Sequence, residues 1–370
     1  MRKRSWVWFA SIAASGAIGM VYACSSDEAA PPRGGGCIGA GCYDVGPLED
    51  GPSSDAGDGG EGGPIVYPDP LEGTTKEATL VRGGFTFTEG PVWIGGRLLF
   101  TDIPTNRIRI LNPDGGPTTG FRQNSNGANG LAVDPMGRLL VAEGAGNPPN
   151  GRRITRSPND PTGMIAVVTA TFGTPPTAYN SPNDVVVRGD GNIYFTDPNY
   201  GGAINGNNQL PFEGAYRVDL LGAVTRLGGN FTRANGIALS PDGSTIYVVD
   251  NGAATLNAAT VNADGTVGDF ASIANLGTAP SGDGMAVDDA GNLYVADRAG
   301  IDVFDKTGNK LGTITLPDGV GTTNCTFGGP DRKTLYITAN GPILPADGGG
   351  TEPNPVSGVY QIVLNVPGLP

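Results

Sequence analysis

Six oxygen-bearing side chains occupy one recurring position of a repeated sequence pattern. Each stands 13 to 15 residues before the end of a short apolar segment such as GNIYFTD or GNLYVAD. The six residues are Glu89, Asn129, Asn183, Asn235, Asp283 and Asn324. Carboxylate and amide oxygens are the ligands that Ca²⁺ takes, at about 6–8 per ion. Asn and Asp are also common turn residues, so the alternative that these side chains only shape loops stays open.

The absence of histidine from all 370 residues restricts the chemistry further. No Ser-His-Asp triad, Cys-His pair or His-ligated zinc site can form. A general base must therefore be a carboxylate, a lysine or a tyrosine. Turn chemistry explains the two carboxylates of the set, Glu89 and Asp283, least well. We expect a divalent cation beside them, with Ca²⁺ as the first choice and Zn²⁺, Mn²⁺ or Mg²⁺ as alternatives.

The apolar segment that follows each of these residues occurs six times, at intervals of about 40–55 residues. Its copies include GRLLFTD ending at Asp102, GNIYFTD ending at Asp197 and KTLYITA ending at Ala339. A turn sequence precedes five of the copies and another apolar run precedes each turn, so every repeat begins with a hairpin. The rest of each repeat has room for two more strands, and four strands per repeat are typical of a β-propeller blade.

The sequence therefore predicts an all-β, six-bladed β-propeller with a central metal site. The last apolar segment, GVYQIVL at 358–364, is expected to share a blade with ATLVRGGFTF at 78–87, which would close the ring and remove a free sheet edge. The first strand of each blade lines the central channel, so the six residues would form a ring at one mouth. The aspartates that end the second strands, such as Asp102 and Asp250, are interpreted as structural.

Several segments resemble the gluconolactonase family, which includes regucalcin and luciferin-regenerating enzyme. They include EGPVW at 89–93, NSPNDVVV at 180–187, NGIALSPDG at 235–243 and GDGMAVDDAGNLYVA at 282–296, and the likeness extends over about residues 80–365. The resemblance implies a propeller with one divalent cation in its channel and hydrolysis of sugar lactones such as gluconolactone. It places the metal-holding positions on Glu89, Asn183, Asn235 and Asp283, and it makes Asp283 the catalytic base as well.

Four further residues are expected to contact substrate. Asn129 and Asn324 can exchange hydrogen bonds with sugar hydroxyls, and Tyr200 can frame the channel mouth. Ser181 stands where regucalcin carries a substrate-binding arginine, and Gly144 stands where bacterial relatives often carry a histidine. Two alternatives remain open, a non-catalytic calcium-stabilised propeller that binds a ligand or partner, and a propeller esterase acting on other lactones or phosphoesters.

The N-terminal residues carry an export signal. Basic residues 2–4 precede an apolar stretch that ends in Ala23-Cys24, which is typical of a secretory signal peptide and resembles a lipoprotein cleavage site. We expect residues 1–23 to be the signal peptide and Cys24 to carry lipid, with an uncleaved membrane anchor as the alternative. The protein would then be exported and lipid-anchored at the bacterial cell envelope, in the periplasm or at the outer membrane.

Composition sets the remaining expectations. Residues 24–78 are Gly-rich and acidic, which predicts a disordered tether before a propeller at 79–370, and Cys37 and Cys42 within it are expected to form a disulfide. Cys325 is expected to be a buried core thiol.

The net charge of −13 opposes nucleic-acid binding. We therefore expect a small-molecule lactone substrate, no nucleic-acid partner and a monomer.

Overall fold

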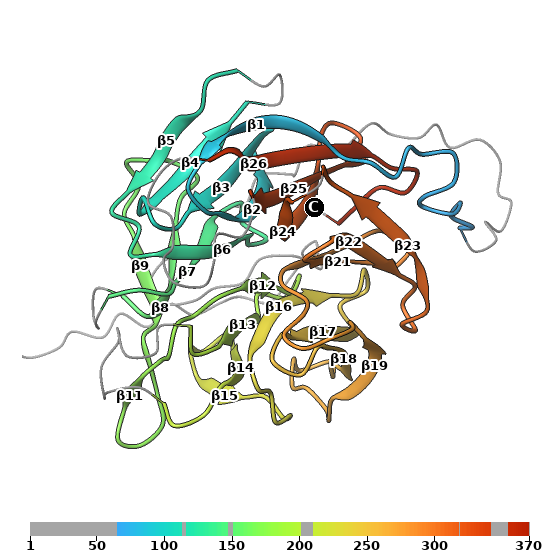
Figure 1. Cartoon of the computed structure of the whole chain (residues 1–370). Helices are drawn as coiled ribbons and strands as arrows, with labels where there is room; N and C mark the ends of the chain where they lie inside the picture. Colours follow the sequence, from blue (N-terminus) through green and yellow to red (C-terminus); the bar gives the residue numbers. More distant parts are fainter. Residues whose placement is uncertain are drawn as a thin grey trace, which may run out of the picture. The chain divides into compact units, whose positions relative to one another are not determined.

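The strands form six four-stranded antiparallel sheets arranged around a common centre (Figure 1). The computed structural model describes residues 65–112, 116–146, 151–200, 210–317, 319–341 and 354–369. These residues contain no helix, and so none that could span a bilayer. The predicted signal peptide, Cys24, the Cys37–Cys42 disulfide and the tether up to residue 64 lie outside the described residues.

In blades 1 to 5 the strands follow the chain from the innermost to the outermost. Blade 1 contains β2 (Thr88–Ile94), β3 (Arg97–Asp102), β4 (Arg107–Leu111) and β5 (Thr119–Gln123). Blade 2 contains β6 (Ala128–Val133), β7 (Leu139–Glu143), β8 (Arg153–Ser157) and β9 (Ala166–Thr169). Blade 3 contains β12 (Val185–Val187), β13 (Ile193–Asp197), β14 (Gly214–Val218) and β15 (Val224–Arg226). A small hairpin of β10 (Thr171–Phe172) and β11 (Thr177–Ala178) precedes blade 3.

The second half of the ring repeats the pattern. Blade 4 contains β16 (Ala234–Leu239), β17 (Thr245–Asp250), β18 (Thr255–Thr260) and β19 (Ala271–Asn275). Blade 5 contains β20 (Met285–Val287), β21 (Leu293–Asp297), β22 (Gly300–Phe304) and β23 (Lys310–Thr315). Blade 6 contains β24 (Gly321–Gly328), β25 (Thr334–Asn340), β26 (Asn354–Val363) and β1 (Thr79–Phe85).

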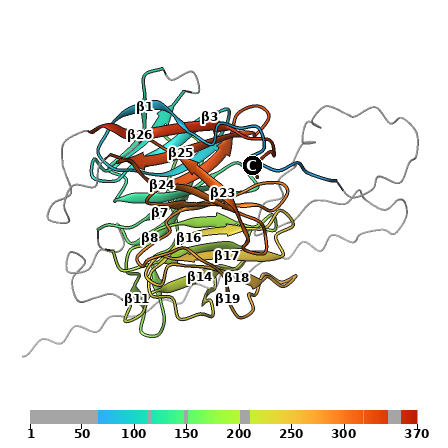
Figure 2. The same cartoon turned by 45° about the vertical axis from the view of Figure 1, so that its right-hand side comes forward.

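Blade 6 closes the ring as the sequence predicts. Its outermost strand β1 pairs antiparallel with β26, with Thr79 opposite Gln361 and Gly83 opposite Gly358. Figures 1 and 2 both show these two strands side by side. The two ends of the propeller are thus joined within a single sheet, and the prediction of six closed blades is confirmed.

The apolar cores lie between adjacent blades. One buried cluster joins Leu99 of blade 1 to Leu131 and Val141 of blade 2, and another joins Tyr194 of blade 3 to Val248 of blade 4. Because a second strand such as β7 or β13 is covered on both faces, it is buried along its whole length. This burial on both faces explains why these strands appear in the sequence as continuous apolar runs instead of alternating ones.

The ordered domain begins earlier than we expect from composition. Leu71 is buried in a cluster with Ile314 and Leu335, and the backbone of Lys76 accepts a hydrogen bond of 2.8 Å from the Thr315 N–H. The compact unit starts at Ile65. Assigning residues 71–78 to a disordered tether is therefore wrong, because Leu71, Ala78 and the Lys76 backbone pack against blades 5 and 6.

Candidate active site

The six predicted ring residues sit where the innermost strands are locally irregular. In four blades the strand register shifts beside the ring residue, as between Glu89 and Val92 and between Ala234 and Ile237. Asn183 and Asp283 lie just before β12 and β20. A bulge redirects the side chain that it carries, so the repeated sequence position is also a repeated backbone feature.

Glycines next to the ring residues allow neighbouring blades to touch. The Gly130 N–H donates to the Asn183 carbonyl at 2.6 Å, and a Cβ added at Gly130 would lie 2.6 Å from Asp184 Cα. A Cβ at Gly236 would lie 2.4 Å from the Asp283 carbonyl oxygen. Such approaches exclude any side chain, and they bring ring residues from successive blades close together.

Two carboxylates of the ring, Glu89 and Asp283, influence each other. Burial is the main cause that raises the pKa of Asp283 well above its usual range, and the charge of Glu89 raises it further. Burial likewise raises the pKa of Glu89, although Gly90 N–H donates to its Oε2 at 2.8 Å. Asn235 hydrogen-bonds Asp283 and Asn324 hydrogen-bonds Glu89, which favours the ionised forms. Four predicted residues, Glu89, Asn235, Asp283 and Asn324, thus form one cluster.

The other two ring residues, buried Asn183 and half-buried Asn129, contribute amide groups. Asn183 is 5% exposed, and its backbone N–H and carbonyl bond to Thr196 and Gly130 respectively. The Oδ1 atom of Asn129 is buried without a hydrogen-bond partner. An oxygen left in this way costs free energy unless a cation or a donor meets it.

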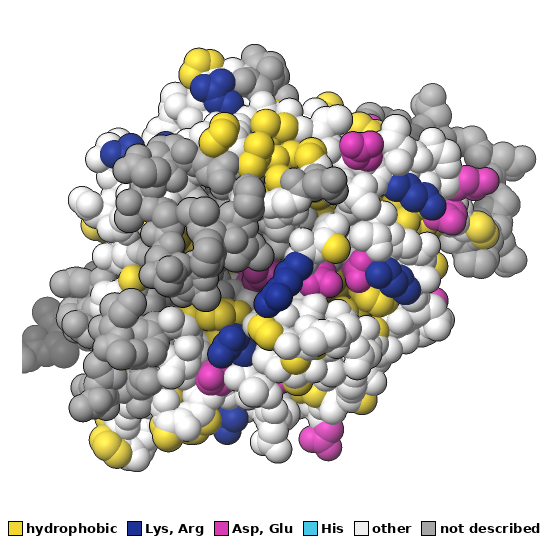
Figure 3. Space-filling view, viewed as in Figure 1, with side chains coloured by type: hydrophobic (Ala, Val, Ile, Leu, Met, Phe, Trp, Pro, Cys, Tyr) yellow, Lys and Arg dark blue, Asp and Glu magenta, His cyan; other side chains and the backbone are white. Residues whose placement is uncertain are grey.

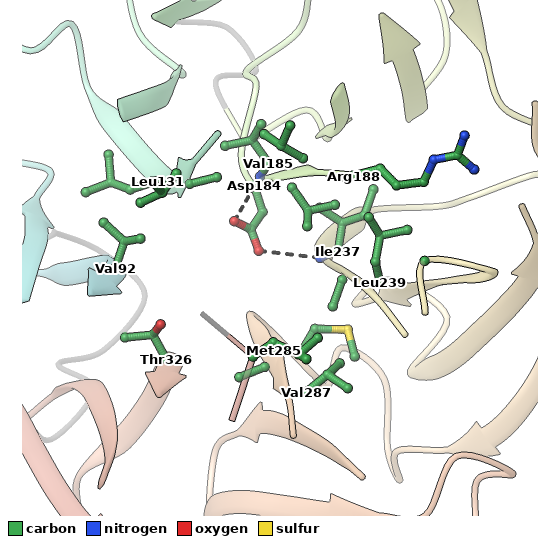
Figure 4. Close-up of a pocket in the computed structure, with 18 of the residues that line it drawn as sticks. Val92, Leu131, Asp184, Val185, Arg188, Ile237, Leu239, Met285, Val287 and Thr326 are labelled. Atoms are coloured by element: carbon green, nitrogen blue, oxygen red, sulfur yellow. Dashed lines mark hydrogen bonds between the residues drawn. The ribbon is translucent and has the colours of Figure 1, made fainter. Parts of the chain in front are cut away.

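A third carboxylate, Asp184, joins the cluster although we do not predict it from the sequence. Its Oδ1 accepts from Val185 N–H at 2.9 Å and its Oδ2 from Ile237 N–H at 3.4 Å (Figure 4). Burial raises its pKa to about 7, while these bonds and the Asn324 amide lower it. A signal does exist in the sequence, because the residue after the ring position is Gly in four repeats and is charged only here.

The cluster borders two cavities. A cavity of about 900 Å³ is lined mainly by apolar side chains of the innermost strands, including Val92, Leu131 and Ile237, together with Asp184 and Asn324 (Figure 4). A smaller cavity of about 220 Å³ is lined by Asp283, Asp297 and Arg298 among others. Acidic and basic side chains lie beside one another near the middle of the face in Figure 3. The predicted base therefore opens to the smaller cavity.

Tyr200 lies at the cluster as expected, whereas Ser181 has a different role. The Tyr200 hydroxyl accepts a hydrogen bond from Asn235 Nδ2 at 2.7 Å, and the Arg233 guanidinium lies 5.3 Å from the centre of its ring. Burial first, and then the charge of Asp283, raises the pKa of Tyr200. The Ser181 hydroxyl donates to the Pro198 carbonyl and accepts from Tyr200 N–H at 3.0 Å. It therefore holds the Tyr200 segment in place.

The aspartates at the ends of the second strands are structural, as we predict. Both oxygens of Asp197 accept backbone N–H groups, from Asn180 and Ser181 at 2.8 Å each. Asp250 accepts from the corresponding residues of blade 4, at 2.9 and 2.8 Å. These bonds fix the loop that leads into each innermost strand. Cys325 is likewise a buried core thiol, at 3% exposure.

The residues of the cluster fit a cation that binds oxygen. Among the described residues no group of three or more His, Cys, Asp or Glu side chains is arranged to hold a metal, so amide oxygens would have to complete the site. Asn129 Oδ1 supplies an unpaired buried oxygen. No ion pair in the described part of the chain neutralises Glu89, Asp184 or Asp283.

Known proteins share this fold and these segments. Residues 87–341 match the model of the SMP-30/gluconolactonase/LRE-like region. The chain is 30% identical over 289 residues to a gluconolactonase of Zymomonas mobilis, an alignment covering 70% of this chain and 78% of the relative. It is 31% identical to chicken (Gallus gallus) regucalcin over 143 residues, which is 37% of this chain and 47% of regucalcin.

Solved structures of other proteins show the same fold. A gluconolactonase from Xanthomonas campestris superposes with a TM-score of 0.63 at 29% identity, covering 82% of this chain and 98% of that one. A calcium-binding regucalcin from Agrobacterium tumefaciens shares the fold, with a TM-score of 0.64 at 22% identity over 79% of this chain and 95% of that one. The chain therefore belongs to the SMP-30/gluconolactonase/LRE-like family.

Proposed function

We propose that this protein hydrolyses sugar lactones with the help of a bound divalent cation, Ca²⁺ first. The observation that carries the proposal is the pair of ring carboxylates, buried Glu89 and half-buried Asp283, which has no cationic partner among the described residues. The charge of Glu89 raises the pKa of Asp283, and two such carboxylates are costly unless a proton or a cation offsets their charge. The gluconolactonase of Zymomonas mobilis supports lactones as the substrate class.

Glu89, Asn183, Asn235 and Asp283 would hold the cation. When bound, a cation of this kind polarises a carbonyl oxygen as a Lewis acid. No histidine is needed for this chemistry, which agrees with the composition of the chain.

Asp283 would accept a proton from the attacking water. It is a ring carboxylate that lines the smaller cavity. The Asn235 hydrogen bond favours the ionised form that a base needs, and a cation beside Asp283 would favour the same form. Asn129 and Asn324 would orient the hydroxyls of the substrate through their amides.

We further propose that the protein acts at the bacterial cell envelope, anchored through lipid on Cys24. The basic N-terminus, the apolar stretch and Ala23-Cys24 support export. Mass spectrometry of the mature N-terminus tests this. The expected result is cleavage before Cys24 with acyl chains on it, lost in Cys24→Ser, and an intact residue 1 would contradict the proposal.

The decisive test of the activity is a panel of lactones assayed after chelation, with and without added Ca²⁺. We expect turnover that disappears on chelation and returns with the metal. Asp283→Asn should abolish turnover while the fold, followed by circular dichroism, stays intact. Ligand binding without turnover would contradict the proposal and favour a non-catalytic propeller, and faster turnover of a phosphotriester would favour an esterase of another class.

A further inference from the structure

The larger cavity occupies the central channel between the ring residues and the opposite face of the propeller. Asp184 and Asn324 bound its inner end, and the turns that follow the innermost strands, such as 134–137 and 240–243, bound its outer end. The ring residues stand at the starts of these strands and the turns at their ends. The cavity therefore opens away from the ring mouth, and its volume of about 900 Å³ is in the range of small-molecule sites.

Apolar side chains form the walls of this cavity. They come from the innermost strands of several blades and include Val92, Leu131, Ile237, Met285 and Val287. Figure 4 shows these side chains surrounding the middle of the cavity. A ligand gains affinity here by burying carbon atoms, at about fourfold for each methylene group that leaves water.

One carboxylate points into this apolar space. Asp184 is 7% exposed, and Figure 4 shows its side chain directed into the cavity that it lines. Its Oδ1 accepts from Val185 N–H at 2.9 Å, whereas its Oδ2 receives the longer bond of 3.4 Å from Ile237 N–H. Asp184 forms no ion pair with any described residue. A buried carboxylate in such surroundings is stabilised by a cation that reaches it.

The cavity itself offers no such cation. Among its described lining residues the cationic side chain is Arg188, which extends away from Asp184 in Figure 4. The Arg188 guanidinium donates to Asp190 Oδ2 at 2.9 Å and to the Asn262 carbonyl at 2.7 Å. Asp242 also lines the outer end. The charge along the cavity is therefore negative, which favours the entry of a cation and opposes that of an anion.

The dication of the proposed function would not remove this charge completely. Glu89, Asp184 and Asp283 carry three negative charges when they are ionised, and a dication at the ring supplies two positive ones. Asp283 lines the smaller cavity and Asp184 lines the larger one. A single positive charge that approaches through the larger cavity would meet Asp184 first and complete the balance.

We propose that the larger cavity is a second ligand site, which binds a small apolar molecule carrying one ammonium group. The nitrogen would donate to Asp184 Oδ2, and the hydrocarbon part would pack against the apolar walls. An inorganic monocation would satisfy the carboxylate but leave the apolar walls in contact with water. The site lies on the other side of the ring from the lactone mouth, so the inference does not depend on lactone hydrolysis.

The test is calorimetric titration of the Ca²⁺-saturated protein at pH 8 with hexylammonium, hexanol and hexanoate. The charge-assisted hydrogen bond predicts that hexylammonium binds about 10–100-fold more tightly than hexanol, and hexanoate should bind least. Butylammonium and ethylammonium should bind more weakly in steps of about fourfold per methylene removed. Equal affinity for hexylammonium and hexanol, or an affinity that does not depend on chain length, would overturn the inference.

Three variants locate the ligand. Asp184→Asn should abolish the preference for hexylammonium over hexanol, and Val187→Phe, which fills part of the cavity, should weaken the binding of both. Asp269→Asn changes an exposed aspartate outside the cavity and should bind as wild type does. If Asp184→Asn does not fold, Val187→Phe and the ligand series still decide. A preference that persists in Asp184→Asn, or binding unaffected by Val187→Phe, would contradict the site.

A comparison with and without Ca²⁺ separates this site from the ring. Hexylammonium that binds only after chelation would be occupying the ring in place of the dication, and the inference would be wrong. Binding in Ca²⁺ by a protein that opens no lactone would support the site and overturn the proposed function alone. Turnover of lactones without hexylammonium binding would have the opposite meaning.

Discussion

At the scale of single residues, the site concentrates negative charge that the protein itself does not neutralise. Glu89, Asp184 and Asp283 come from three blades, and burial raises the pKa of all three. Amide groups of Asn235 and Asn324 are their main polar side-chain contacts. These three carboxylates lower the stability of the metal-free protein, because their charges have no cationic partner. A bound dication would offset their charge and stabilise the folded state.

This cost predicts how stability depends on pH without metal. Asp184 has a folded pKa of about 7 against a usual value of 3.8, so between these values the folded state binds more protons than the unfolded state. The free energy of unfolding should therefore fall as pH rises from about 4 to about 7. Urea unfolding in chelator across this range measures it, and Asp184→Asn should reduce the slope while leaving the shares of Glu89 and Asp197, whose folded pKa values are each about 8. A slope that is unchanged in the variant would contradict this.

Tyr200 provides a second residue-scale prediction. Since Asn235 Nδ2 donates to the Tyr200 hydroxyl, the Oδ1 of that amide is left to face another group. Tyr200→Phe removes the acceptor, and losing one hydrogen bond of about 0.5–1.5 kcal/mol predicts Ca²⁺ binding weaker by about 2–10-fold. Calorimetric titration with Ca²⁺ measures this, with Tyr67→Phe as the control. Equal affinity in both variants would mean that Tyr200 does not orient the amide.

At the scale of elements, the innermost strand and its glycine determine how closely the blades approach. The ring position was predictable because it recurs 13 to 15 residues before the end of a strand that is buried on both faces, such as β7 or β13. Contacts between blades were not predictable, because no periodic pattern reports them. Asp184 with Ile237 and Tyr200 with Asn235 are examples of such contacts. Leu71 was missed because it stands alone among Gly, Pro and acidic residues.

The glycine contact can be tested directly. A Cβ at Gly130 would lie 2.4 Å from Asp184 Oδ1 and 2.6 Å from its Cα, so Gly130→Ala must separate blades 2 and 3. We expect a destabilisation of about 1–3 kcal/mol, typical of overpacking. Gly120→Ala is the control, because nothing lies within 4 Å of a Cβ there. The urea midpoint of Gly130→Ala should be clearly lower than that of Gly120→Ala. Equal midpoints would show that blades 2 and 3 can move apart here without loss of stability.

At the scale of the whole molecule, the propeller depends on β1 to complete blade 6. A chain that begins at Ile65 retains Leu71 and β1 and should unfold at the same temperature as the full chain. A chain that begins at residue 86 exposes the edge of β26, which removes the pairing that holds the ring shut. We expect it to melt at a markedly lower temperature or to aggregate, as scanning calorimetry and light scattering would report. Equal melting of both chains would contradict a stabilising role for the closure.

Because β1 and β26 come from opposite ends of the domain, the ring cannot close until the last strand of the domain has been synthesised. Until then the earlier blades form an open arc whose terminal apolar surfaces lack their partners. Apolar surface that is exposed in this way makes the incomplete domain prone to aggregation until the ring closes.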